Sequence, residues 1–194
     1  MRILPGTAAM SEAGAPKVIG FFGDSGSGKT TLIERLIARF HARGLRVAAV
    51  KHAHHGFDVD RPGKDSYRFR AAGAAQVLLA SERRWALLGE TVAPAEGGDV
   101  LARQLARLDP CDLVLIEGFR GQAGVPFIHV RRRLAGGDGP APAAAARDRV
   151  AGLIAVASDE RLPEDQEKGI PVLDLNDIDA IAAFIAARLG VKTC

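Results

Sequence analysis

Short, continuous apolar runs alternate along the chain with segments whose apolar residues recur at helical spacing. VIGFF (residues 18–22) is a run of the first kind, typical of a strand buried on both faces of a parallel sheet. Residues 29–43 follow the helical pattern, and Gly44 is well placed as the C-terminal stop of that helix. LRVAAV (residues 45–50) reads as the next buried strand. Together these segments predict a β-α-β unit.

The same alternation continues to the end of the chain. The later elements that we expect are a helix capped by Asp65 and running through Ala72, two short strands at QVLLA and WALL, a helix from Asp99, strands at DLVLIEGF, VPFIHV, VAGLIAVAS and IPVLDL, and a terminal helix that begins at Asn176 or Asp177 and ends at Gly190. Strands that alternate with helices predict an α/β fold with a mostly parallel sheet, extended by short strands.

The length of 194 residues favours one domain, which we expect over residues 17–194. Residues 1–16 have no sustained pattern and are expected to form a flexible tail, so Met10 is an alternative start to Met1. Residues 134–146 are mostly Gly, Pro and Ala with a single charge, which is typical of a loop.

Composition narrows the possible partners and the compartment. The net charge is only +3, from 26 basic and 23 acidic residues, which disfavours a nucleic-acid-binding surface. Cys111 and Cys194 are the two cysteines, too few for a disulfide framework, so a reducing cytoplasm fits best. The sequence holds no apolar stretch of about 18 residues, so we expect no membrane span.

GDSGSGKT (residues 23–30) fits the phosphate-loop pattern GxxxxGK[ST] and lies between a predicted strand and a predicted helix. Glycines let consecutive N–H groups point at phosphate, and Lys29 supplies a cation for the outer phosphates. Thr30 is expected to place its hydroxyl on Mg²⁺, and Thr31 to contact the innermost phosphate. The predicted nucleotide-binding residues here are Gly23, Asp24, Ser25, Gly26, Ser27, Gly28, Lys29, Thr30 and Thr31.

A phosphate loop needs a second acid to hold the magnesium, usually at the end of an apolar strand. Glu117 stands at that place in LVLIEG and is predicted to be the metal or water partner. A buried ion pair is the alternative role. Asp112 opens the same strand and is therefore expected at the opposite end, with a structural role.

KHAHHGFDVDRPGKDSYRFR (residues 51–70) follows the second strand, so Lys51 and His52 emerge at the sheet edge where ligands bind in doubly wound folds. We interpret this stretch as a switch-like segment that senses the nucleotide or a second anion, in which Asp60 or Asp65 orients water or magnesium. Its candidate residues are Lys51, His52, His54, His55, Asp60, Lys64, Asp65, Ser66 and Arg68. The alternatives are a metal site, a nucleic-acid patch and a solvated loop with Asp65 as a helix cap.

The combination of GDSGSGKTTL, KHAHHGFDVDRPGKDSYRFRAAGA, SERRWAL and DLVLIEGFR resembles the MobB family, the molybdopterin-guanine dinucleotide biosynthesis adapter proteins. The resemblance spans most of the chain, from residue 17 to about 158. It implies a P-loop GTPase similar to the signal-recognition and metallochaperone branch. It also implies GTP and Mg²⁺ as ligands, a homodimer, and feeble GTP hydrolysis with Glu117 and Asp65 as candidate catalytic residues. The implied partner is the MobA guanylyltransferase, which joins GMP to molybdopterin and which a MobB protein assists.

Guanine selection has a weaker sequence signal, because the usual NKxD motif is absent. ASDE (residues 157–160) follows a late strand, where the family's base-reading loop belongs, so Ser158 and Asp159 are the candidate base-binding residues. A carboxylate can accept hydrogen bonds from N1 and N2 of guanine, which adenine does not match. The alternative is an exposed loop acid.

Arg120 and the arginines of residues 131–133 lie in a stretch without acidic residues, residues 118–133. This stretch is a candidate second anion site, for the molybdopterin phosphate or the partner enzyme by resemblance, or else a solvated basic edge.

Two other functions remain open: a metallochaperone GTPase that carries nickel or zinc through His52, His54 and His55, and a small-molecule kinase with residues 134–146 as a lid.

Overall fold

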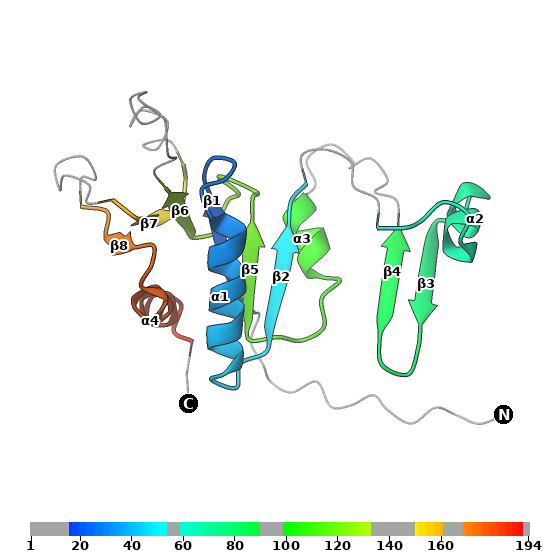
Figure 1. Ribbon diagram of the computed structural model, residues 1–194, viewed down its shortest axis with the longest axis horizontal. Coiled ribbons are helices and arrows are strands. Elements are labelled where there is room, and N and C mark those ends of the chain that lie inside the picture. The colour runs from blue at the N-terminus through cyan, green and yellow to red at the C-terminus, as the bar shows by residue number, and fades with distance from the viewer. Residues whose placement is uncertain (1–15, 54–58, 90–98, 133–149, 161–168, 192–194) are drawn as a thin grey trace. The chain divides into compact units, whose positions relative to one another are not determined.

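The fold is described here from a computed structural model, which defines residues 16–53, 59–89, 99–132, 150–160 and 169–191 (Figure 1). The chain divides into two compact units. Unit 1 comprises Met1–His52 and Leu105–Cys194, and unit 2 comprises Ala53–Gln104. The single domain expected over residues 17–194 stays a prediction.

Unit 1 is built on a six-stranded sheet with the strand order β2-β5-β1-β6-β7-β8. Its strands are β1 (Lys17–Phe22), β2 (Val47–Lys51), β5 (Leu113–Glu117), β6 (Phe127–Arg131), β7 (Leu153–Ser158) and β8 (Val172–Asp174). All neighbouring strands pair in parallel, so their carboxyl ends meet at one edge. The predicted α/β fold is confirmed, although β2, β6 and β8 each begin two residues later, and β7 three residues later, than the sequence pattern indicated.

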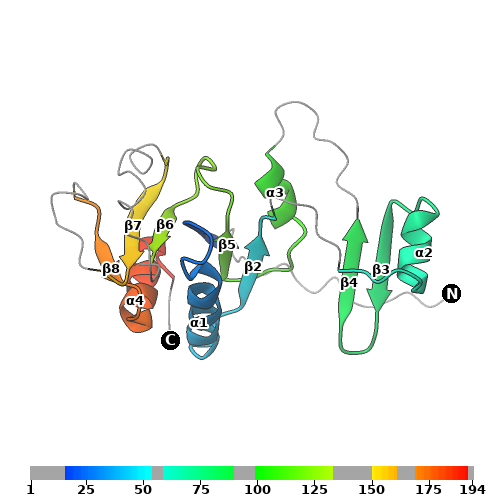
Figure 2. The same ribbon diagram turned by 45° about the horizontal axis from the view of Figure 1, so that its top comes forward.

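Helices α1 (Lys29–His41) and α4 (Ile178–Leu189) lie side by side on the same side of this sheet (Figures 1 and 2). Their apolar faces are buried in one core with the strands; Leu36 and Phe40 of α1 and Ile185 of α4 are fully enclosed. Between the helices, the guanidinium of Arg39 pairs with Asp179. This packing fixes α1, and with it the loop that precedes α1, against the sheet.

The ends of α4 follow the predicted capping pattern. Asp177 is the N-cap, and its carboxylate accepts a hydrogen bond from the Ala180 N–H at 2.9 Å. Gly190 ends the helix in the left-handed conformation with φ 64°. Of the two residues that the sequence offered as the start, Asp177 rather than Asn176 is therefore the cap.

Close approach of a side chain explains the glycine in the middle of β1. A Cβ placed on Gly20 would lie 2.2 Å from the Phe127 ring, which is fully buried on the neighbouring strand. The same ring makes an edge contact with Phe22, with centroids 6.0 Å apart. Gly20 therefore allows an aromatic residue to pack across β1.

Among the described residues, unit 2 contains one complete helix, a hairpin and most of a second helix, whose last residue belongs to unit 1. Helix α2 (Asp65–Ala71) contacts β3 (Gln76–Ala80), which pairs antiparallel with β4 (Trp85–Gly89). These strands are the predicted strand extension, and they form a separate two-stranded sheet. The helix α3 (Val100–Leu105) follows, with the Asp99 carboxylate accepting from the Ala102 N–H at 3.0 Å.

The predicted cap of α2 was wrong by one residue. Lys64 occupies the N-cap position in an extended conformation, and no side chain caps the helix. Asp65 is the first helical residue, where its charge still complements the positive end of the helix dipole. The helix ends at Ala71 rather than Ala72, before Gly73 with φ 98°.

No helix in the described part of the chain is long and apolar enough to cross a membrane.

Candidate functional site: a phosphate loop at the carboxyl edge of the sheet

Residues 23–28 connect β1 to α1 through a loop that only a glycine-rich sequence can form. Gly23, Gly26 and Gly28 have φ values of 155°, 77° and 91°. A Cβ on Gly23 would lie 2.2 Å from the Val130 carbonyl oxygen of β6, so the loop also passes close to the neighbouring strand. The predicted phosphate loop therefore has the backbone that the motif requires.

The amino end of α1 is suited to an anion. Gly28 is its N-cap, without a side-chain hydrogen bond to the first-turn N–H groups, and the first turn has no acidic residue. The backbone N–H groups and the positive end of the helix dipole are thus directed at the loop, as in known phosphate sites.

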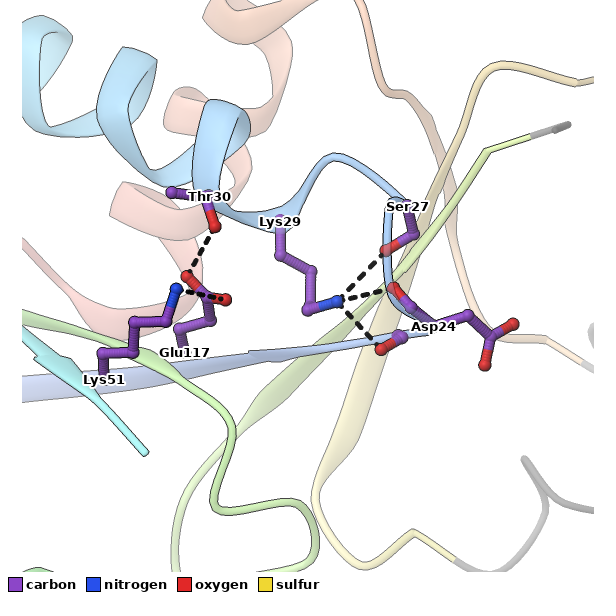
Figure 3. A network of polar contacts seen from close by, with 7 residues as sticks. Asp24, Ser27, Lys29, Thr30, Lys51 and Glu117 are labelled. Atoms are coloured by element: carbon purple, nitrogen blue, oxygen red, sulfur yellow. Dashed lines mark hydrogen bonds and ion pairs between the residues drawn. The ribbon is translucent and has the colours of Figure 1, made fainter. Parts of the chain in front are cut away.

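Lys29 folds back over the loop (Figure 3). Its ammonium group donates to the carbonyl oxygens of Gly23 at 2.9 Å and Asp24 at 2.6 Å, and to the Ser27 hydroxyl at 3.5 Å. These acceptors hold the cation inside the loop, where the outer phosphates of a nucleotide are expected. The lysine is therefore close to its predicted position, with loop carbonyls as its partners.

A second polar cluster joins two strands and a helix beside the loop. The Thr30 hydroxyl donates to Glu117 Oε2 at 2.9 Å, and Lys51 Nζ lies 3.4 Å from Glu117 Oε1 (Figure 3). Register explains the meeting, because Glu117 is level with both Phe21 on β1 and Lys51 on β2. The Glu117 side chain is only 16% exposed, so its charge is partly shielded from water.

These side chains fit a magnesium ion. Mg²⁺ prefers oxygen ligands and binds proteins through one or two carboxylates together with substrate phosphates. The Thr30 hydroxyl and the Glu117 carboxylate supply such oxygens beside the phosphate loop, as the sequence predicted. The strand-end carboxylate and the loop hydroxyl are thus a suitable pair to hold the ion.

The turn after β5 is fixed by His52. The His52 N–H donates to the Glu117 carbonyl at 2.8 Å, and its ring stacks on Phe119 with centroids 4.3 Å apart. Gly118 (φ 96°) leaves no room for a side chain, since a Cβ there would lie 2.9 Å from His52 Cβ. Phe119 itself has a positive φ of 51°. His52 therefore packs against the turn that carries Glu117.

On the other side of the loop, β7 brings in the candidate base-reading residues. Ser158 is buried at the end of the strand, and its hydroxyl accepts from the Glu160 N–H at 3.1 Å. The Asp159 carboxylate lies 3.7 Å from Arg132 Nε. The segment ASDE thus forms a turn at the same edge of the sheet as the phosphate loop.

Arg132 is a residue that the sequence indicated only as part of a basic run. Its guanidinium lies beside Gly28, whose Cβ, if present, would be 3.7 Å from Arg132 Cζ. No local sequence signal singled it out, because its position one residue beyond the end of β6, between β1 and β7, depends on the strand order.

Arg120, the other candidate of the basic stretch, lies over an aromatic column at the same edge. Its guanidinium carbon is 5.0 Å from the Phe22 ring centroid, and Phe22 stacks on His129 with centroids 4.7 Å apart. The structure therefore gives Arg120 a defined neighbour on the strand that leads into the phosphate loop. Arg133 lies outside the described residues.

The candidate switch residues of unit 2 interact with one another. The Asp60 side chain is 5% exposed; its Oδ1 accepts from the Ser66 hydroxyl at 2.8 Å, and its Oδ2 lies 3.2 Å from Arg70 Nε. Asp65 and Arg68 form an exposed pair at 3.6 Å. Asp60 and Ser66 thus hold the start of α2 in place. The role of Asp60 or Asp65 in orienting water or magnesium stays a prediction.

The alternative functions are tested only in part. Among the described residues, no three His, Cys, Asp or Glu side chains are grouped to hold a metal ion. His54 and His55, which the metallochaperone hypothesis needs, and residues 134–146, the kinase lid, lie outside the described residues.

Asp112 is at the amino end of β5, as expected, and accepts from the Arg46 N–H at 2.7 Å. Burial, with the nearby Asp112 carboxylate, raises the pKa of the Cys111 thiol.

The chain is similar to known proteins over most of its length. The sequence model of the family described as "Molybdopterin guanine dinucleotide synthesis protein B" matches residues 18–159, from β1 to the turn after β7. The chain belongs to the MobB family. Two relatives, from Escherichia coli (strain K12) and Haemophilus influenzae, are each 42% identical and are named "Molybdopterin-guanine dinucleotide biosynthesis adapter protein". The alignments cover 87% of this chain in both cases, and 90% and 86% of the relatives.

The MobB fold is also found among solved structures. The crystal structure of a molybdopterin-guanine biosynthesis protein B is 30% identical, with a TM-score of 0.64, over 89% of this chain and 99% of that one. This match extends over both units of the chain, so the P-loop fold predicted from the sequence is confirmed together with the MobB family.

Proposed function

We propose that this chain is an adapter protein of molybdopterin guanine dinucleotide biosynthesis that binds GTP with Mg²⁺ and assists a MobA-like guanylyltransferase. The observation that carries the proposal is the phosphate loop of residues 23–30, with Lys29 inside it and Thr30 joined to Glu117 at its rim. The names of the two 42% identical relatives support the biosynthetic role.

The residues of the loop suggest how a triphosphate is held. Lys29 exchanges the carbonyl oxygens of Gly23 and Asp24 for the outer phosphate oxygens, a charge-assisted contact that is stronger than the one it replaces. Thr30 and Glu117 hold the magnesium ion, which, when bound, neutralises charge on the β- and γ-phosphates. Lys51 stays near Glu117 and limits the excess negative charge before the ion arrives.

Hydrolysis by this site is proposed to be slow. Rapid phosphoryl transfer needs a group that orients the attacking water and a cation that stabilises the transition state. Glu117, the carboxylate beside the loop, already accepts from Thr30 and pairs with Lys51, an arrangement suited to an ion partner rather than to a base. The site is thus better suited to holding GTP than to consuming it.

The choice of guanine is assigned to the turn after β7. Asp159 can accept from the two hydrogens that guanine presents on N1 and N2, and buried Ser158 orders the turn by accepting from Glu160. This supports GTP rather than ATP as the ligand.

A homodimer is the proposed assembly. The hairpin of unit 2 presents one face made of Leu78, Ala80, Trp85 and Leu87, in which Leu78 pairs across from Leu87 and Ala80 from Trp85. Leu78 and Trp85 are 62% and 60% exposed. A clustered apolar face of this kind is typical of an interaction surface.

Arg120, held over Phe22, is the proposed contact for a molybdopterin phosphate.

The test is a guanylyltransferase assay with its cognate enzyme, with and without this protein, together with calorimetry of GTP binding. We expect Mg·GTP to bind more tightly than Mg·ATP and the protein to raise dinucleotide synthesis. Lys29→Ala should lose both effects, whereas Lys17→Ala, at the opposite end of β1, should keep them. GTP binding without any effect on the synthesis would retain the nucleotide site and remove the adapter role.

A further inference from the structure

Three neighbouring strands bring the parts of the proposed nucleotide site together. The strand order places β6 between β1 and β7. The phosphate loop follows β1, and the base-reading turn follows β7, at the same carboxyl edge. A nucleotide that reaches from the loop to the turn must therefore pass over the end of β6.

Arg132 stands at that end. Its neighbour Arg131 is the last residue of β6 and is level with Ser158 on β7, so Arg132 and Asp159 each leave their strand at the same height. The Arg132 side chain contacts both sides of the site: its Nε lies 3.7 Å from Asp159 Oδ2, and its guanidinium packs beside Gly28 at the amino end of α1.

The guanidinium of Arg132 packs directly beside Gly28. A Cβ on Gly28 would already be in van der Waals contact with the guanidinium, at 3.7 Å from both Cζ and Nε and 3.8 Å from Nη2. The guanidinium is thus beside the N–H groups that are aimed at phosphate. It remains 43% exposed, so its outer face is accessible to a ligand.

We propose that Arg132 binds the middle of the nucleotide, its α-phosphate and ribose, and positions Asp159 for guanine. The inference rests on the proposed GTP site. A guanidinium has five N–H donors, so it can hold a carboxylate and a phosphate oxygen at the same time. An ionised carboxylate has about four acceptor positions, so Asp159 can accept from Arg132 and from guanine together.

The absence of the NKxD motif gives Arg132 a specific role beside Asp159. NKxD has a lysine two positions before its aspartate, whereas the residue two positions before Asp159 is Ala157, which is fully buried. The cation beside the base-reading acid therefore comes from the neighbouring strand, as Arg132.

The experiment measures binding of GTP, GDP and ITP, each with Mg²⁺, to the full chain and its variants by calorimetry. Arg132→Ala should weaken GTP and GDP by about 10- to 100-fold, because a charge-assisted contact to a part common to both is lost. It should also lower the preference for GTP over ITP, which lacks the 2-amino group. Arg132→Lys should recover part of the affinity and little of the preference, because lysine lacks the planar fork.

Arg46→Ala is the matched control, because Arg46 forms a similar pair with Asp112, 3.8 Å from Nε to Oδ2, at the opposite edge of the sheet. It should bind nucleotides like the wild type. Wild-type affinity and wild-type GTP preference in Arg132→Ala would overturn the inference alone, even if that variant melts at a lower temperature. A wild-type chain that does not bind GTP would overturn the proposed function and this role with it.

Discussion

The Thr30 hydroxyl donates a 2.9 Å hydrogen bond to Glu117, a residue 87 positions further along the chain. The bond joins the first turn of α1 to the end of β5, and Lys51 on β2 lies 3.4 Å from the other carboxylate oxygen. The oxygens proposed to hold magnesium are thus brought into contact by the strand order itself.

Glu117→Gln should weaken the magnesium dependence of GTP binding. The amide keeps the size of the side chain and can still accept from Thr30, but it removes the charge that favours a divalent ion. We expect GTP affinity in Mg²⁺ to fall by about tenfold, roughly 1.4 kcal/mol, and affinity in EDTA to change little. The measurement is GTP titration with and without Mg²⁺. An equal loss in both conditions would assign Glu117 a structural role.

Asp159→Asn should reduce the discrimination between GTP and ITP. The amide cannot accept from N1 and N2 of guanine through both of its polar atoms, because one of them is a donor. ITP has only the N1 hydrogen, so it should lose less affinity than GTP. Competition binding of the two nucleotides gives the ratio, and equal losses would remove Asp159 from base recognition.

The variants Asp60→Asn and Ser66→Ala distinguish a structural role of these residues from a role as a nucleotide switch in unit 2. Asp60 is almost fully buried between Ser66 and Arg70, so replacing its charge should lower the free energy of unfolding by about 3 kcal/mol. Ser66→Ala removes one hydrogen bond and should cost about 1 kcal/mol. Urea unfolding measures both. Unchanged stability together with altered GTP hydrolysis would instead support the interpretation of these residues as a nucleotide switch.

Gly20→Ala should destabilise unit 1. Its new methyl group would lie 2.2 Å from the buried Phe127 ring, and overpacking of this kind costs about 1–3 kcal/mol or more. Gly89→Ala is the control, because a Cβ there meets its nearest neighbour at 3.4 Å; its free energy of unfolding should stay within about 1 kcal/mol of the wild type. Chemical denaturation compares the two, and equal stabilities would mean that Phe127 repacks without cost.

The double variant Leu78→Glu with Trp85→Glu should disrupt a homodimer formed through the hairpin. Both side chains lie on one exposed face, and two charges there oppose its burial. Light scattering after size exclusion gives the mass. Val172→Glu on β8, also an exposed apolar position at 39%, is the control and should leave the mass unchanged. A dimer that persists in the double variant would place the interface elsewhere.

The sequence predicted the fold well wherever one local pattern decided the structure. The apolar runs gave the strands, and the phosphate-loop motif gave the backbone of residues 23–28 with Lys29 inside it. Glu117 was found because the end of a buried parallel strand has a known place relative to a phosphate loop. Cap positions were less accurate, since Lys64 rather than Asp65 precedes α2 and no side chain makes a cap bond there.

Contacts between distant residues could not be read from local patterns. In the sequence, Asp60 was a candidate to orient water or magnesium. Its burial beside Arg70 depends on how α2 folds back toward Asp60, which no local pattern shows. Arg132 was one of three consecutive arginines, and only the order of β1, β6 and β7 places it between a glycine of the phosphate loop and Asp159.

The connection between β2 and β5 has a consequence for sequence variation. These strands are direct neighbours in the sheet, yet all of unit 2 lies between them in the chain. The entropy lost on closing the long segment between β2 and β5 grows only with the logarithm of its length. Lengthening or shortening this segment therefore changes the stability of the sheet very little. Unit 2 is therefore the part of the molecule where homologous chains can gain or lose residues, and acquire new surfaces, while the register that aligns Lys51 with Glu117 is kept.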